Sequence, residues 1–117
     1  MKKLLLNDTI KGLNDETVST QTGRYVTEET GARVAEITPV KFGSLALAKI
    51  LRSRTGTDAE ATALFDLGQR INENLALATP TQIEVSDEEF ATIKGAIDSE
   101  AVVVKARFIE MVESLNA

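Results

Sequence analysis

Two capping boxes decide how this chain folds: Thr57-Asp58-Ala59-Glu60 and Ser86-Asp87-Glu88-Glu89. In each box the first hydroxyl accepts a hydrogen bond from the backbone N–H three residues later, and the glutamate accepts one from the backbone N–H of the first residue. Apolar residues follow both boxes at helical spacing. The boxes therefore predict a helix from Asp58 to about Asn74 and another that starts after Ser86 and ends at Gly95 or at Asp98-Ser99.

Two further helices complete the expected helical part of the chain. The segment from Glu100 to Leu115 carries a wide arc of apolar residues, so we expect it to be the most buried helix. Upstream, the pattern predicts a helix over Leu45 to Arg54. It starts either at Thr38-Pro39, a good N-cap and first-turn pair, or at Gly43-Ser44. About four helices are thus expected over residues 39–117.

One apolar stripe contains a glycine. In the helix after Asp58, the stripe at i, i+3, i+4 and i+7 spacing consists of Ala61, Leu64, Phe65, Gly68 and Ile71. Glycine within a helix costs about 1 kcal/mol relative to alanine. We expect this stripe to be buried and Gly68 to mark the close approach of another backbone.

The first 38 residues have the composition of strands and turns. Short strands are predicted at 3–7, 17–27 and 32–38. Glu28-Glu29-Thr30-Gly31 makes a hairpin turn in which Gly31 is free to take a positive φ. A short extended piece at 81–85 is expected to join the N-terminal sheet.

The strand at 17–27 is polar on both sides, so its register is weakly specified. Three interpretations stay open for it: an edge strand, a mobile arm over residues 14–33, or a surface that becomes ordered on a partner.

Composition excludes several kinds of chemistry. The chain has no Cys and no His, which removes thiolate catalysis, disulfides, and the usual general base and transition-metal ligand. No phosphate-binding glycine motif or calcium loop occurs. No segment approaches the roughly 18 apolar residues of a membrane span, and Asn7-Asp8 ends the apolar start of the chain too early for an export signal. We expect no enzyme activity, no cofactor, no metal and no membrane contact.

Charge is distributed unevenly between the two halves. Residues 1–56 hold nine Lys or Arg and six Asp or Glu, whereas residues 57–117 hold four and twelve. An acidic second half disfavours nucleic-acid binding, and the predicted second helix has Arg70 as its only cation. Lys49, Arg52 and Arg54 form a candidate interaction or anion patch, although cations are also common at helix C-termini.

Several segments, taken in order, resemble a group of small proteins of unknown function encoded in tailed-bacteriophage genomes. They are Lys3-Leu4-Leu5, Thr38-Pro39-Val40-Lys41-Phe42-Gly43, Leu64 to Ile71, Glu84-Val85-Ser86-Asp87-Glu88-Glu89 and the helix Val103 to Leu115. The resemblance implies a phage setting and a small accessory or assembly role, and it carries no catalytic residues. A longer polar stretch at residues 14–33 departs from the pattern.

Together these features predict one α+β domain over residues 1–117. Its N-terminal antiparallel strands, at 1–38, pack on a layer of about four helices at 39–117. The expected function is a non-enzymatic phage protein that acts through protein contacts, as an assembly, accessory or virion-associated homo-oligomer in the host cytoplasm. The alternative is a phage-encoded modulator that binds a host enzyme or defence complex through its acidic face.

Overall fold

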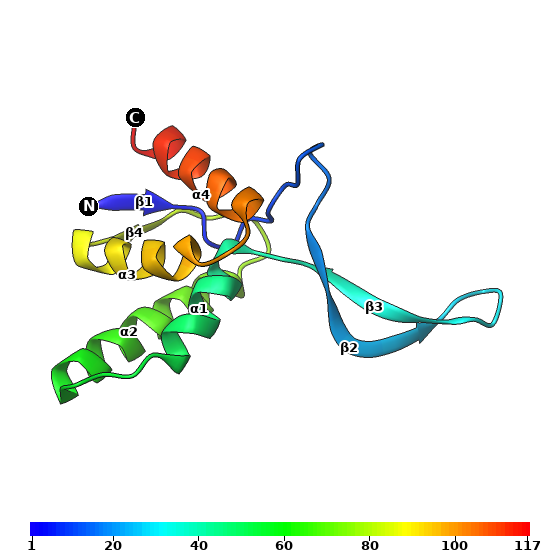
Figure 1. The fold of residues 1–117 in the computed structure, drawn as a ribbon, viewed down its shortest axis with the longest axis horizontal. Coiled ribbons are helices and arrows are strands. Elements are labelled where there is room, and N and C mark those ends of the chain that lie inside the picture. Colours follow the sequence, from blue (N-terminus) through cyan, green and yellow to red (C-terminus); the bar gives the residue numbers. More distant parts are fainter.

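The computed structural model describes all of residues 1–117 as an α+β fold with four helices and two two-stranded antiparallel sheets (Figure 1). In chain order the elements are β1 (Lys2–Leu4), β2 (Ser19–Thr27), β3 (Arg33–Pro39), α1 (Phe42–Arg52), α2 (Asp58–Leu75), β4 (Ile83–Val85), α3 (Asp87–Asp98) and α4 (Val102–Leu115). The predicted fold class is therefore confirmed, as are four helices at nearly the predicted positions.

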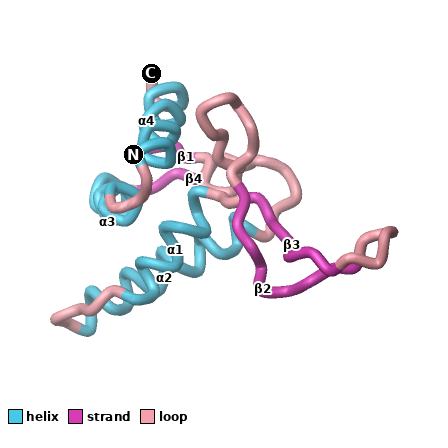
Figure 2. Tube along the Cα trace, turned by 45° about the vertical axis from the view of Figure 1, so that its right-hand side comes forward, coloured by secondary structure: helices cyan, strands magenta, loops and turns pink.

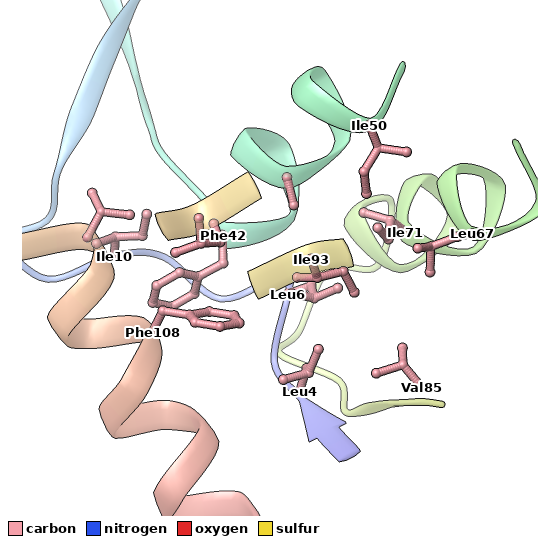
Figure 3. Packing of buried hydrophobic residues seen from close by; sticks show 13 residues of the cluster. Leu4, Leu6, Ile10, Phe42, Ile50, Leu67, Ile71, Val85, Ile93 and Phe108 are labelled. Atoms are coloured by element: carbon pink, nitrogen blue, oxygen red, sulfur yellow. The ribbon is translucent and has the colours of Figure 1, made fainter. Parts of the chain in front are cut away.

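The smaller sheet joins the start of the chain to a segment near residue 84. β1 pairs with β4 so that Lys2 faces Val85 and Leu4 faces Ile83. Leu4 and Val85 are both buried in the core (Figure 3). The predicted extended piece at 81–85 thus does join the N-terminal strand.

The core is one cluster of thirteen apolar side chains that come from β1, β4, all four helices and the segment after β1. Phe108 of α4 lies near its centre (Figure 3), with ring centroids 5.8 Å from Phe42 and 6.3 Å from Phe90. The members are Leu4, Leu6, Ile10, Phe42, Ala46, Ile50, Leu67, Ile71, Val85, Ile93, Ile97, Val104 and Phe108.

α4 is not the most buried helix, so that prediction is wrong. Only Val104 and Phe108 of α4 are buried, whereas α1 and α2 each bury four residues. α1 packs against both α2 and α3, while α4 lies at the edge of the body, where Val102 is 86% exposed. The wide apolar arc of α4 exceeds the surface that its neighbours cover.

The first helix starts later than its best sequence signal. Thr38 and Pro39 remain in β3, paired with Thr20 and Ser19, so they cannot cap a helix, and α1 begins at Phe42 instead. The backbone of Gly43 donates a hydrogen bond of 2.7 Å to the Leu6 carbonyl. A Cβ atom at Gly43 would lie 2.8 Å from that oxygen, so close backbone contact occurs here.

The two capping boxes differ in completeness. At α3 both hydrogen bonds form, since Ser86 Oγ accepts from Glu89 and the Glu89 carboxylate accepts from the Ser86 backbone. At α2, Thr57 Oγ1 accepts from Glu60, but the Glu60 carboxylate accepts from the Gly56 N–H instead. Both helices nevertheless begin where the boxes predict.

The buried stripe of α2 is shifted from the predicted one. Leu67, Gly68, Ile71 and Asn74 are buried, whereas Phe65 is 58% exposed and Ala61 is exposed. The atoms nearest to a Cβ at Gly68 belong to the side chains of Leu47 and Leu51, each at 3.5 Å. The predicted backbone approach at Gly68 is therefore wrong, because α1 places leucine side chains there.

Two buried asparagines hold the connection between α2 and β4. Asn7 donates to the Thr79 carbonyl at 2.8 Å and accepts from the Thr81 N–H at 2.9 Å. Asn74 donates to the Thr81 carbonyl at 3.0 Å. These bonds tie the exposed loop at residues 79–81 to two buried amide side chains.

β2 and β3 form a long hairpin, here called the arm (Ser19–Pro39), which projects away from the helices (Figures 1 and 2). The predicted turn is confirmed, with Gly31 at φ 84°. Two details differ from the expectation. The hairpin does not pack on the helical layer, and it continues to Pro39, beyond the predicted arm at 14–33.

Candidate protein interfaces

The arm has a fixed root in the body. Three backbone hydrogen bonds link its base in a ring: Ile10 donates to Val40 at 3.0 Å, Val40 to Val18 at 2.8 Å, and Val18 to Ile10 at 2.8 Å. Ile10 is a core residue, and Val18 and Val40 pack against the core. The root therefore fixes the direction in which the arm leaves the body.

Arg107 of α4 braces the turn beside this root. Its guanidinium donates to the carbonyls of Lys11 at 3.2 Å and Gly12 at 2.8 Å, and pairs with Asp15 at 3.2 Å. Glu110 holds the same group at 3.2 Å. Sequence reasoning missed this contact, because no local pattern connects an arginine of the last helix to a turn near residue 12.

The arm carries large apolar side chains that are open to solvent. Alternation along β3 places Arg33, Ala35 and Ile37 on one face, and Tyr25 lies directly opposite Ala35. Tyr25 is 64% exposed and Ile37 is 65% exposed. The Arg33 guanidinium lies 5.6 Å from the centre of the Tyr25 ring. The arm thus presents a tyrosine and an isoleucine that no part of this chain covers.

A second open apolar surface lies between α1 and α2, here called the α1–α2 groove. A hollow of about 270 Å³ is lined by Leu47, Leu51, Phe65, Gly68, Gln69 and Asn72. Leu51 is 62% exposed, and with Phe65 it also lines a neighbouring hollow of about 180 Å³ that reaches Ser53 and Thr55. Gly68 leaves room for the groove, because a larger side chain there would fill it.

The predicted patch of Lys49, Arg52 and Arg54 divides into two parts. Lys49 turns toward the end of α3, where its ammonium donates to the Ala96 carbonyl at 2.8 Å and to Ser99 Oγ, and pairs with Glu100 at 2.6 Å. Lys49 therefore fastens α1 to the α3–α4 turn.

Arg52 and Arg54 remain exposed and form no ion pair. Arg52 is the last residue of α1, and Arg54 lines a hollow of about 320 Å³ between α2 and α3 together with Glu60, Glu88 and Glu89. As an anion site this position is weak, because the Glu60 carboxylate already occupies the start of α2 through the Gly56 N–H.

A further charged cluster lies at the end of α3. Hydrogen bonds from Lys94, together with the charge of Lys105, hold the pKa of the Asp98 carboxyl below its ordinary value of 3.8. The ammonium groups lie 3.1 Å and 3.6 Å from the Asp98 oxygens. All three side chains are partly exposed, so this cluster is an ordinary ion-pair network at the surface.

The carboxylates of the second half do not gather into a metal-binding group; no three of the chain's Asp and Glu side chains do. No helix has the length and apolarity needed to cross a membrane. No protein-family model matches the chain, and the comparisons with curated proteins and with solved structures likewise give no match. What the chain does must therefore be inferred from its own surfaces.

Proposed function

We propose that this chain is a non-enzymatic protein that acts through protein contacts and self-associates, with an assembly or accessory role in a bacteriophage. The observation that carries the proposal is the pair of open apolar surfaces, the arm and the α1–α2 groove. Side chains such as Tyr25, Ile37, Leu51 and Phe65 are more than half exposed. Leu51 and Phe65 line the same hollows, and exposed apolar groups that gather in this way mark interaction sites.

The design of the arm supports the same proposal. A two-stranded hairpin is marginal in water unless something packs against it, and its outer strand edges offer unpaired N–H and C=O groups. The arm comprises 21 residues. We expect it to be stabilised when another surface covers it. The phage setting rests on the resemblance of the short segments described above.

Light scattering at micromolar concentration tests self-association. We expect a mass of a dimer or larger, against 12.6 kDa for one copy. A mass that stays at one copy over the whole concentration range would contradict the proposal. Mass spectrometry of purified virions then tests whether the role is structural.

A second candidate function is a modulator that binds a host enzyme or defence complex through its acidic face. The observation that favours it is a set of exposed carboxylates on α2, β4 and α3 that form no ion pair. They are Asp58, Glu60, Asp66, Glu73, Glu84 and Glu88. Genes next to the coding sequence distinguish the two roles, since assembly proteins lie beside capsid or tail genes and modulators among small early genes.

A further inference from the structure

We propose that the α1–α2 groove is the contact surface of a symmetric dimer, in which it is covered by the same groove of a second copy of this chain. The two copies are related by a two-fold axis parallel to the helices. α1 of each copy then lies on α2 of the other, and the four helices enclose Leu51 and Phe65. This inference rests on the proposed self-association and names the surface that carries it.

The side chains around this groove are uncharged. No Asp, Glu, Lys or Arg lines either the groove or the neighbouring hollow, although charged residues make up 26% of the chain. Charged residues are depleted in the same way at the cores of protein interfaces. A strongly charged partner such as a nucleic acid would find no ionic contacts here, whereas another uncharged protein surface would be complementary.

The groove is also complementary to itself in shape. Leu51 and Phe65 project into solvent, with exposed fractions of 62% and 58%. Beside these two side chains lie the hollows of about 270 Å³ and about 180 Å³, and Gly68 adds no side chain to the larger one. A two-fold axis places the same surface of both copies in contact. The projecting side chains of each copy therefore enter the hollows of the other.

Charge decides which helices face each other across the axis. α1 and α2 form an antiparallel helical hairpin that extends away from α4 and the arm in both views (Figures 1 and 2). α1 contains no acidic residue and two cations: Lys49, which pairs with Glu100, and Arg52, which is unpaired. α2 contains four carboxylates and a single cation, Arg70, which pairs with Glu89. Because opposite charges attract across an interface and like charges repel, each α1 lies on the α2 of the other copy rather than on its own counterpart.

At the rim of the groove, Arg52 comes level with Asp66 of the second copy. Within one copy Leu51 and Phe65 line the same two hollows, so they lie at about the same height along the helix pair, and a two-fold axis parallel to the helices preserves that height. Arg52 and Asp66 each follow one of these residues by one position, a rotation of about 100° around the helix. Both are exposed, form no ion pair and lie outside both hollows. The symmetric dimer therefore contains this ion pair twice.

The experiment uses full-length variants and measures the dissociation constant of the dimer by analytical ultracentrifugation. Phe65→Asp places a charge in the uncharged groove. Val102→Asp is the matched control, because Val102 is 86% exposed on α4. Tyr25→Asp with Ile37→Asp tests the arm in the same way. Circular dichroism with a thermal midpoint checks that each variant folds like the parent.

We expect the parent to form a dimer and Phe65→Asp to dimerise at least roughly tenfold more weakly, since aromatic anchors dominate binding. The control should dimerise like the parent. The arm variant should also form dimers, because the proposed contact does not include the arm.

A charge exchange tests the orientation of the two copies and leaves the groove intact should Phe65→Asp disturb folding. Arg52→Glu and Asp66→Arg should each weaken the dimer at low salt, because each change creates two repulsive contacts. A variant that carries both changes should regain the affinity of the parent, since the two charges are exchanged but still opposite. Arg24→Glu makes the same charge change on the exposed arm and should have no effect.

Three outcomes overturn the inference. If the parent dimerises and Phe65→Asp dimerises equally well, another surface holds the copies together, and only the groove-to-groove arrangement fails. If the variant with both charge changes stays as weak as the single variants, the two-fold axis parallel to the helices is wrong. If the parent remains a monomer at every concentration, the proposed self-association itself fails.

Discussion

The two sheets of this protein have the same number of strands and opposite surroundings. β1 and β4 pair over three residues each, yet Leu4 and Val85 are completely buried. β2 and β3 are nine and seven residues long, yet all of β2 is exposed. Ladder hydrogen bonds contribute little net free energy when water competes for them, whereas buried apolar area contributes about 25 cal/mol per Å². The short sheet therefore belongs to the stable body, whereas the long one has little buried apolar area to stabilise it.

The largest effect should come from the centre of the body. Phe108→Ala removes a buried ring that contacts Phe42 and Phe90, and we expect a loss of roughly 3 to 5 kcal/mol in the free energy of unfolding. Urea denaturation measures it, with Val102→Ala on the same helix as the exposed control. A loss below about 1 kcal/mol would mean that α4 contributes little to the core.

The next largest effect is expected from the hydrogen bonds of the Asn7 side chain. Asn7→Ala removes two part-buried hydrogen bonds, from the Asn7 amide to the Thr79 carbonyl and from the Thr81 N–H to Asn7, and each such bond contributes about 0.5 to 1.5 kcal/mol. We expect a loss of about 2 kcal/mol by urea denaturation, while Asn14→Ala in an exposed turn changes little. Equal stability of the two variants would show that the α2–β4 connection is held by its apolar contacts alone.

A smaller effect is expected from the arm. Tyr25→Ala should change the free energy of unfolding of the isolated copy by less than about 0.5 kcal/mol, because surface substitutions rarely do more. Amide hydrogen exchange at low concentration should then show β2 and β3 exchanging much faster than β1 and β4. If the amides of the arm were as well protected as those of β1, the conclusion that the long sheet is less stable than the short one would be wrong.

The smallest effect is expected from Asp98, and it disappears in strong acid. Because the pKa of Asp98 is lowered in the folded chain, its ion pairs stabilise the fold above the unfolded-state pKa, and this contribution is lost as the pH falls through the folded-state value. We expect Asp98→Asn to lower the thermal midpoint slightly near neutral pH and to match the parent in strong acid. A constant difference over the whole pH range would indicate a structural effect of the amide rather than a lost charge.

Local signals predicted much of this fold, and their limits have physical reasons. Ser86 and Thr57 specify helix starts through bonds that lie within four residues, so the sequence alone reveals them. Thr38 and Pro39 make an equally good local start, but β2 pairs with them. Pairing with β2, about 20 residues earlier in the chain, therefore overrode the local signal.

The candidate interfaces likewise combine features that local sequence predicts with features that depend on tertiary packing. Arg52 and Arg54 are exposed as predicted, although α1 ends at Arg52, so Arg54 lies two residues beyond the helix that was predicted to reach it. The contacts of Lys49 with Ala96 and Glu100, and of Arg107 with Gly12, join residues far apart in the chain. The exposure of Phe65 likewise depends on how α1 lies across α2. Contacts of this kind depend on the tertiary packing, so a short stretch of sequence does not predict them.

The joining of the two chain ends has a consequence for synthesis on the ribosome. The backbone N–H of Lys3 donates to the Asn116 side chain at 2.9 Å, and that side chain donates back to the Lys3 carbonyl at 3.0 Å. β1 emerges early but waits for β4, α4 and Asn116 before its contacts are complete, whereas β2 and β3 are neighbours in the chain and can pair at once. While translation continues, the nascent chain therefore presents its hairpin before the body that carries it has closed.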